Sequence, residues 1–307
     1  MAKTLPKGLY APLLVFFNDH DEIDYEAFAK HAKYVTASGV LPVVSASMGE
    51  AVHLTPQERV KLIQTLRNDL DSTGLRETPI VAGVGGNSNR ETIQLARDAA
   101  AAGANFAPVI APGFWAGYLK GNPMAVRKFF VDVAAASPIP VGIYNFPPMA
   151  GGIDLDSDDV VDIARLAPNL CGIMLSKTCK DHRSTQRYQF HNAGWLIDFL
   201  LPSVVVGSAG AISPLPNIAP KFSMKLWKLT QNLETKADFT NAQLAQGVAS
   251  LGEAALLKSG VPGLKYLLKK QFGYPAAPRS PLMTYGDVDG LSKNKYIDDV
   301  LKLEKTS

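Results

Sequence analysis

The sequence LCGIMLSKTCKDH, which runs from Leu170 to His182, decides how this chain is organised. Its first six residues are apolar or small and predict a buried strand. The seven residues after them are polar and include amine, thiol and imidazole groups. In α/β proteins with parallel strands, ligands bind beyond the carboxyl ends of the strands. The stretch therefore predicts a strand that brings reactive groups to one end of a sheet or barrel.

Short apolar runs alternate with longer amphipathic segments on both sides of this stretch. Such alternation predicts βα units and a parallel sheet. The candidate strands are residues 9–17, 40–44, 79–82, 106–110, 141–144, 170–175, 195–197 and 209–212. Eight strands suit closure, so we expect an α/β fold of the TIM (β/α)8 barrel type with a C-terminal helical extension. Residues 1–213 are expected to form the barrel core, and residues 214–307 the eighth helix and the extension of the same structural unit.

Helix start and stop signals lie between these strands. Thr55, Pro56 and Glu58 form a capping box with proline at the first helical position. Gly39 and Gly103 follow two periodic segments, as C-terminal caps do. The segment between the sixth and seventh strands is short for a crossover helix. The expected helices are residues 25–38, 56–70, 90–102, 124–136, 157–165, 183–192, 199–206, 217–232, 241–257, 262–272 and 293–303.

The composition excludes several classes of protein. Hydrophobic residues make up 47% and charged residues 19%, which is typical of a globular protein and not of a disordered or membrane-spanning one. The net charge of +3 is spread along the chain, so we expect neither nucleic-acid nor membrane binding. Cys171 and Cys179 are the only cysteines, and reduced thiols in a cytoplasmic protein are expected. The zinc-type cysteine spacing is missing, and we expect no metal and no cofactor.

Two strand ends carry candidate binding and catalytic groups. The run SASMGE, from Ser45 to Glu50, combines hydroxyl groups with a glycine that lets backbone amides approach a carboxylate. An ordinary polar turn explains the same residues. The fifth strand ends at Tyr144, whose phenol can relay a proton in the barrel mouth or can be a core side chain with one hydrogen bond. His53 has an ordinary structural interpretation in the turn that follows Glu50.

The sixth strand brings Met174, Ser176 and Lys177 toward the same end. A lysine in an apolar barrel mouth has its pKa lowered by desolvation, and the neutral amine can form a Schiff base with a carbonyl. A solvated surface lysine is the alternative. His182 and Cys179 are a weaker candidate for a base and nucleophile, because no third group that would orient them is visible in the sequence.

With these motifs in order, the chain resembles the dihydrodipicolinate synthase and N-acetylneuraminate lyase superfamily. Within it, the chain is most similar to the fungal branch of 2-keto-3-deoxy sugar acid aldolases. The likeness extends from Gly8 to Tyr274. It rests on the motifs GEAVHLT at 49–55, GVG at 83–85, YNFP at 144–147, GGIDL at 151–155, DFLLP at 198–202 and GAIS at 210–213.

The resemblance implies a TIM barrel with a helical extension, assembled as a homotetramer or homodimer, and a class I aldolase mechanism. In that mechanism a lysine on the sixth strand forms a Schiff base with a 2-oxo acid. Tyr144 matches the tyrosine that moves protons, and Ser47 matches one hydroxyl of the turn that binds the carboxylate. The catalytic candidates are Tyr144 and Lys177. The substrate-binding candidates are Ser47, Met48, Phe114, Met174, Ser176 and Ile212.

The lysine of the family does not match. Relatives have glycine, an aliphatic residue and then lysine, whereas this chain has Gly172, Ile173 and Met174. A thioether cannot form an imine. Lys177 is the nearest substitute, but its odd offset from Met174 directs it to the other face of a regular strand.

Other departures are similar in kind. Gly113 falls where many relatives have a tyrosine, which leaves Phe114 and Trp115 in that loop, and Met149 falls where bacterial synthases have an arginine. These replacements predict a more apolar pocket and a changed substrate.

Three functions are compatible with the sequence. The first is a lyase or cyclase that acts on a carbonyl-containing small metabolite without an imine, for instance in secondary metabolism, with Tyr144 as acid or base and Ser47 stabilising an oxyanion. The second is a 2-oxo acid aldolase that uses the displaced Lys177. The third is a catalytically inactive family member that binds a metabolite or an active partner.

Overall fold

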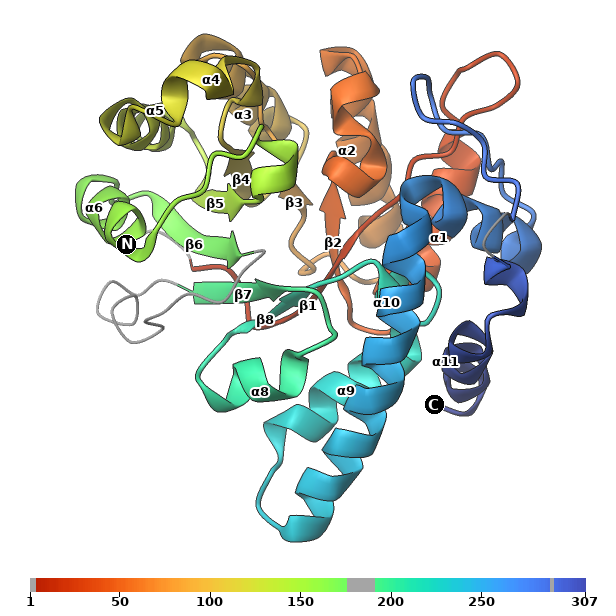
Figure 1. Cartoon of the computed structure of the whole chain (residues 1–307). Helices are drawn as coiled ribbons and strands as arrows, with labels where there is room; N and C mark the ends of the chain where they lie inside the picture. The colour runs from red at the N-terminus through yellow and green to blue at the C-terminus, as the bar shows by residue number, and fades with distance from the viewer. Residues whose placement is uncertain (1–3, 176–190, 288–289) are drawn as a thin grey trace.

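The chain forms a barrel of eight parallel strands, shown in Figure 1. The computed structural model describes residues 4–175, 191–287 and 290–307. The strands are β1 (Gly8–Pro12), β2 (Leu41–Val44), β3 (Val81–Ala82), β4 (Ala107–Ile110), β5 (Val141–Asn145), β6 (Leu170–Leu175), β7 (His191–Trp195) and β8 (Gly210–Ile212). The expected TIM barrel is therefore confirmed.

The barrel closes between its third and fourth strands. The ladder runs β3-β2-β1-β8-β7-β6-β5-β4, so β3 and β4 are its two ends. Val81 forms a parallel bridge with Phe106, and the Ala82 amide donates to the Phe106 carbonyl at 2.9 Å. The Val84 amide continues the contact by donating to the Pro108 carbonyl at 3.1 Å. These bonds satisfy the backbone groups that an open edge would leave unpaired.

Helices surround the barrel and begin at the expected caps. Thr55 and Glu58 form the predicted capping box, with Pro56 in the first turn. In the described ranges, the helices up to β8 are α1 (Tyr25–Thr36), α2 (Pro56–Ser72), α3 (Asn89–Ala101), α4 (Ala116–Leu119), α5 (Pro123–Ala136), α6 (Ser157–Leu166) and α8 (Leu200–Val205). Short 3-10 turns are η1 (Ser47–Gly49), η2 (Ala51–His53), η3 (Gly113–Trp115), η4 (Pro147–Met149), η5 (Leu215–Asn217) and η6 (Leu291–Lys293).

Three helices follow β8, namely α9 (Pro220–Gln231), α10 (Lys236–Phe272) and α11 (Lys295–Thr306). Figure 1 shows α10 running alongside the barrel, with α9 and α11 near it. The α10 helix is broken at Gly260, whose φ of 57° and ψ of −153° are not helical, and Pro262 follows the break. Proline lacks the amide that continues a helix, which explains the kink. The break agrees with the two separate helices expected over 241–257 and 262–272.

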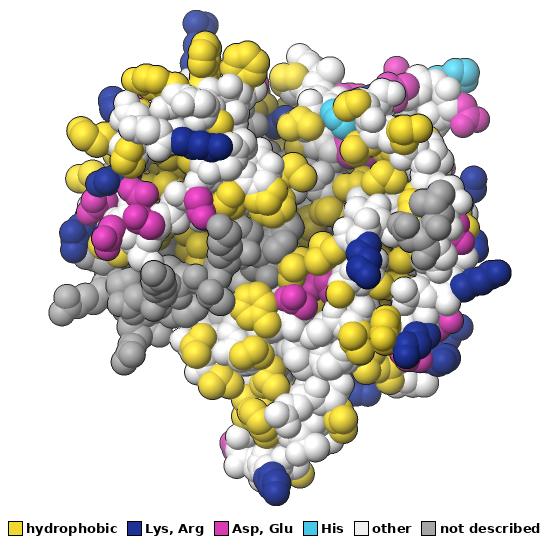
Figure 2. Space-filling view, in the orientation of Figure 1, with side chains coloured by type: hydrophobic (Ala, Val, Ile, Leu, Met, Phe, Trp, Pro, Cys, Tyr) yellow, Lys and Arg dark blue, Asp and Glu magenta, His cyan; other side chains and the backbone are white. Residues whose placement is uncertain are grey.

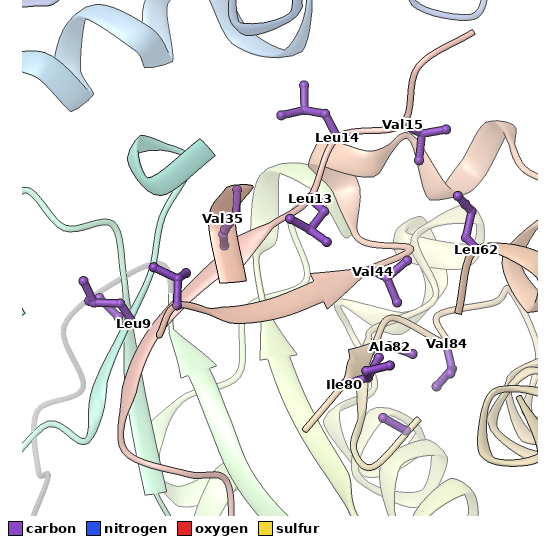
Figure 3. Packing of buried hydrophobic residues seen from close by; sticks show 14 of the residues in the cluster. Leu9, Leu13, Leu14, Val15, Val35, Val44, Leu62, Ile80, Ala82 and Val84 are labelled. Carbon is purple, nitrogen blue, oxygen red and sulfur yellow. The ribbon is translucent and has the colours of Figure 1, made fainter. Parts of the chain in front are cut away.

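The hydrophobic core has two parts. One fills the space between strands and helices, where Leu13, Val44, Ala82 and Val84 pack together (Figure 3). The other lies inside the barrel and consists of the buried residues Leu5, Tyr10, Val43, Val81, Phe106, Tyr144, Cys171, Met174 and Ile212. Tyr144 and Met174, both proposed from the sequence as site residues, thus lie in the barrel interior.

Two expected elements need correction. The seventh strand was expected at 195–197, but β7 is His191–Trp195, and the last two residues of the helix expected over 183–192 belong to it. The rest of that helix lies outside the described residues, as do Ser176 and Lys177. The first strand was expected to reach Phe17, but β1 ends at Pro12. Leu13 to Phe17 remain buried, and beyond β1 their pairing is limited to the Leu13 amide, which donates to the Val43 carbonyl at 2.8 Å, and to a bridge between Phe17 and Ile23.

Candidate active site

A cavity of about 440 Å³ opens at the carboxyl ends of the barrel strands. This is a typical size for a small-molecule site. In Figure 2, hydrophobic side chains border a hollow between the surface formed by α4 and that formed by α2. The polar residues that line the cavity are Ser45, Ser47, Glu50, His53, Arg59 and Tyr144. The apolar side chains are Pro12, Val43, Ala46, Ala51, Val52, Pro108, Ile110, Met149, Met174, Ile212, Val261, Pro262 and Leu282.

Tyr144 and Ser47 meet at the inner end of this cavity. The Tyr144 hydroxyl lies 3.2 Å from Ser47 Oγ, and either oxygen can be the donor. The Tyr144 ring is 9% exposed and stacks on Phe146 at a centroid distance of 5.7 Å. Burial raises the pKa of Tyr144 well above its ordinary value, and the bond from Ser47 only partly opposes this. The phenol therefore stays protonated at neutral pH and can donate a hydrogen bond to a substrate oxygen.

Met174 lies beside Tyr144, at the position where the resemblance to the aldolases leads one to expect a reactive lysine. The two residues are direct partners in the β5–β6 ladder, and both line the cavity. Met174 is 1% exposed and packs in the barrel interior. No lysine is among the described residues that line the cavity. Within the described ranges, the position next to the phenol thus holds a thioether and not an amine.

The turn after β2 adopts an unusual backbone conformation. Ser45 and Glu50 both have positive φ, 54° and 53°, which costs free energy for residues with a side chain. A Cβ atom on Gly83 would lie 2.1 Å from the Ser45 carbonyl oxygen, so the β3 end can approach this turn only with glycine there. Ser45 Oγ is buried and has no hydrogen-bond partner among the described residues. Strain and an unpaired hydroxyl at the cavity wall make this turn a candidate functional element.

Glu50 ties the turn to the C-terminal extension. Its carboxylate is fully buried and forms an ion pair with Lys265 of α10, whose side chain is also fully buried. The other carboxylate oxygen lies 3.3 Å from His53 Nδ1 and accepts from the Arg279 amide at 2.9 Å. Burial lowers the pKa of Lys265, and the Glu50 carboxylate opposes that shift. The pair is positioned to hold the cavity wall in place.

The kink of α10 contributes directly to the cavity. Gly260, Val261 and Pro262 line it, together with Leu282 from the segment that follows α10. The helical extension therefore forms one wall of the site.

The structure brings together some of the predicted site residues. Ser47, Tyr144, Met174 and Ile212 line one cavity. Met48 is partly buried against the core and does not line it, because the η1 turn directs it elsewhere.

Phe114 does not line the cavity either. Its side chain is 77% exposed and packs edge to face against Trp115 at 5.4 Å. Both Phe114 and Met48 stay predictions as substrate contacts. Ser176 and Lys177 lie outside the described residues, and their assignments stay predictions too.

Sequence reasoning missed several cavity residues. Ser45 lies in the strand-end run that was singled out, but its positive φ has no sequence signal. Arg59 follows the capping box and looked like an ordinary helix residue. Val261 and Pro262 lie far along the chain, and only the Gly-Val-Pro sequence hinted at a break there. His53 was given a structural role, yet it lines the cavity.

No group of three or more histidine, cysteine or acidic side chains with metal-binding geometry occurs in the part of the chain that the structure describes. Within the same ranges, no helix is long and apolar enough to cross a membrane.

Comparisons with known proteins agree with this architecture. The model of the dihydrodipicolinate synthetase family matches residues 5–298. The chain is 33% identical to the "Probable 4-hydroxy-2-oxoglutarate aldolase, mitochondrial" of Emericella nidulans, over 99% of this chain and 97% of that protein. It is 31% identical to the L-threo-3-deoxy-hexylosonate aldolase of Hypocrea jecorina, over 99% and 98% of the two chains.

A solved structure of a dihydrodipicolinate synthase family protein from Coccidioides immitis has the same fold. It superposes with a TM-score of 0.85 at 29% identity, over 99% of this chain and 98% of that one.

Proposed function

The chain belongs to the dihydrodipicolinate synthetase family, and on that premise we propose that it is an aldolase-type lyase or cyclase that activates a carbonyl substrate through Tyr144 without a lysine imine. Its relatives are named as aldolases, which supports a lyase of this superfamily. The observation that carries the imine-free step is the Met174 side chain beside the Tyr144 phenol.

The chemistry follows from the protonation state of the phenol. Tyr144 keeps its proton at neutral pH, as a phenol ordinarily does, and burial raises its pKa further. It therefore donates a hydrogen bond to the carbonyl oxygen of the substrate. When the bond between the α carbon and the β carbon breaks, its electron pair passes into an enolate, the β-hydroxyl carbon becomes the carbonyl of the second product, and the hydroxyl proton passes to solvent. The buried phenol and Ser47 stabilise the enolate oxygen by hydrogen bonds.

The substrate class follows from the walls of the cavity. Apolar side chains outnumber polar ones, and Met149 and Met174 are among them. Such walls favour a metabolite with an apolar portion over a highly hydroxylated sugar acid. We place the reaction among tailoring steps of secondary metabolism for this reason.

A class I aldolase reaction at Lys177 is the second candidate. The names of the fungal relatives favour it, since both are aldolases by name and one name contains a 2-oxo acid, 4-hydroxy-2-oxoglutarate. Lys177 lies outside the described residues. Trapping of an imine distinguishes the two candidates.

Proton exchange tests the proposal without knowledge of the full substrate. We would follow exchange of the C3 protons of a panel of 2-oxo acids in D2O by NMR. Catalysed exchange is expected, and Tyr144→Phe should lower its rate about 10²- to 10⁴-fold.

Tyr10→Phe is the matched control, because Tyr10 lies inside the barrel but does not line the cavity, and its hydroxyl donates to the Pro6 carbonyl. Its exchange rate should equal that of the unmodified protein. Exchange that is unaffected by Tyr144→Phe would contradict the role of the phenol.

Two further expectations stay predictions. The homodimer or homotetramer fits the exposed aromatic side chains of Phe114, Trp115 and Tyr118 after β4, and light scattering measures the mass directly. The cytoplasmic location also stays a prediction, because two of the fungal relatives carry the word mitochondrial in their names.

A further inference from the structure

Arg59 is a cation at the cavity wall, and no carboxylate of the described ranges forms an ion pair with it. It lies in the first turns of α2, where its amide donates to the Thr55 carbonyl at 3.1 Å. Its Nη2 donates to the Ala51 carbonyl at 2.6 Å. Its Nε and Nη1 are buried and have no hydrogen-bond partner among the described residues. A guanidinium has five N–H donors, so most of its capacity is unused.

The other partly buried arginines of the described ranges behave differently. Arg67, Arg127 and Arg279 each contact a carboxylate. The partners are Asp71 at 2.9 Å, Asp159 at 2.8 Å and Glu58 at 2.6 Å, respectively. Buried charged donors without acceptors are costly and call for an explanation. Arg59 is therefore the exception, and a bound anion would supply the acceptors that its Nε and Nη1 lack.

The charges around Arg59 leave room for an anion. Burial lowers the pKa of Arg59, and the Glu91 carboxylate opposes the shift from beyond ion-pair range, yet a guanidinium stays charged. Glu91 Oε2 already accepts from the Asn87 amide at 2.7 Å. Glu50, the acidic residue of the cavity lining, is neutralised by Lys265. An entering anion thus meets one uncompensated positive charge.

We propose that Arg59 binds an anionic group at the far end of the substrate from the carbonyl that Tyr144 activates. The substrate class is then a carbonyl compound with an apolar middle and a remote carboxylate. This inference rests on the proposed function for the placement of the carbonyl. Ile110 and Val43 line the cavity that holds both polar ends. Because Nε and Nη1 are covered in this state, the guanidinium turns about its last torsion angles to meet the anion.

Matched pairs of ligands test the proposal. The probes are 2-oxo dicarboxylates of five to seven carbons, each paired with the 2-oxo monocarboxylate of the same length, and affinity is measured by titration calorimetry. At the fitting length, the dicarboxylate should bind about tenfold more tightly or better, because a buried charge-assisted hydrogen bond is gained. In Arg59→Met, the two members of the pair should bind equally, with the monocarboxylate unchanged.

Arg97→Met is the control, because it removes the same charge from an exposed position on α3 that does not line the cavity. It should keep the preference for the dicarboxylate. The absence of that preference at every length, or its survival in Arg59→Met, would overturn the proposal. Binding is measured independently of turnover. If Tyr144→Phe left the exchange rate unchanged while the preference for the dicarboxylate persisted, the proposed role of Tyr144 would be wrong and the anion site at Arg59 would stand.

Discussion

The turn after β2 faces two environments, and they differ in how polar groups are satisfied. On one side, Glu50 is locked between Lys265, His53 and the Arg279 amide. On the other side, Ser47 and Tyr144 face a cavity lined mainly by apolar side chains, and their hydroxyl oxygens lie 3.2 Å apart. The paired charges hold the turn in a strained conformation, and the neutral hydroxyl groups lie at the wall of the cavity. Structure and chemistry are thus assigned to opposite sides of one short segment.

The charged side should be the more sensitive to substitution. Lys265→Met leaves Glu50 buried without its ion-pair partner, so we expect a loss of about 3–5 kcal/mol in the free energy of unfolding. Denaturant titration measures it. The double variant Glu50→Gln with Lys265→Met should recover part of that loss. If Lys265→Met lowered the free energy of unfolding by less than about 1 kcal/mol, the ion pair would not be what holds the charged side of the turn.

The next largest effect on stability is expected for His31, a buried histidine of α1. His31 packs against Tyr274 of the C-terminal segment, and burial lowers its pKa to about 4 despite the hydrogen bond with Asn217. Between pH 6.5 and pH 4 the unfolded chain binds a proton at this residue that the folded chain does not. The contribution of neutral His31 to the free energy of unfolding is therefore fully present above pH 6.5. It is lost as the pH is lowered toward 4, by about 3 kcal/mol in total.

Unfolding free energies across this pH range check the histidine prediction. His31→Gln should flatten the slope between pH 6.5 and pH 4 while keeping a polar partner for Asn217. Equal slopes in the two proteins would show that other groups control the acid sensitivity.

A smaller effect tests the close approach behind the turn. Gly83→Ala places a Cβ atom against the Ser45 carbonyl oxygen, so the β2 and β3 ends must separate. We expect a loss of about 1–3 kcal/mol in stability. Proton exchange should slow as well, since Ser45 and Ser47 belong to the displaced turn. Gly74→Ala is a control for the loss of stability only. An added Cβ atom meets no other atom at Gly74, but the positive φ of that residue makes an alanine strained. A normal rate of proton exchange in Gly83→Ala would show that the turn does not take part in the reaction.

The smallest effect on stability belongs to the reactive side. Tyr144→Phe removes the hydroxyl that contacts Ser47, and we expect the free energy of unfolding to fall by about 1 kcal/mol. The same variant should lose most of the exchange activity. A thermal melt and an exchange assay on one preparation measure both. A large loss of stability would make Tyr144 a structural residue instead.

Much of the fold could be predicted because its signals are local. The capping box at Thr55 and Glu58 appears as expected, and the alternation of apolar runs gave the barrel. β7 was misplaced because its first residues, His191 and Asn192, are polar and do not look like a buried strand. The strand ends that carry Ser47, Tyr144 and Met174 were found from the sequence, since strand order places them at one end of the barrel.

The remaining site residues depend on tertiary contacts. Arg59 is noteworthy only because its neighbours leave its nitrogens without acceptors, which no sequence pattern records. The kink at Gly260 forms a cavity wall because α10 returns to the barrel, more than 200 residues along the chain from the turn it contacts. Met174 could be recognised as unusual only against a family pattern.

The central claim is that carbonyl activation here proceeds without an imine. Borohydride reduction in the presence of pyruvate and other 2-oxo acids, followed by intact mass and peptide mapping, tests it most directly. We predict no adduct in the unmodified protein and an adduct at position 174 in Met174→Lys, since the cavity still accepts the ligand beside Tyr144. An adduct on Lys177 of the unmodified protein would contradict the account and establish a class I aldolase with a displaced lysine.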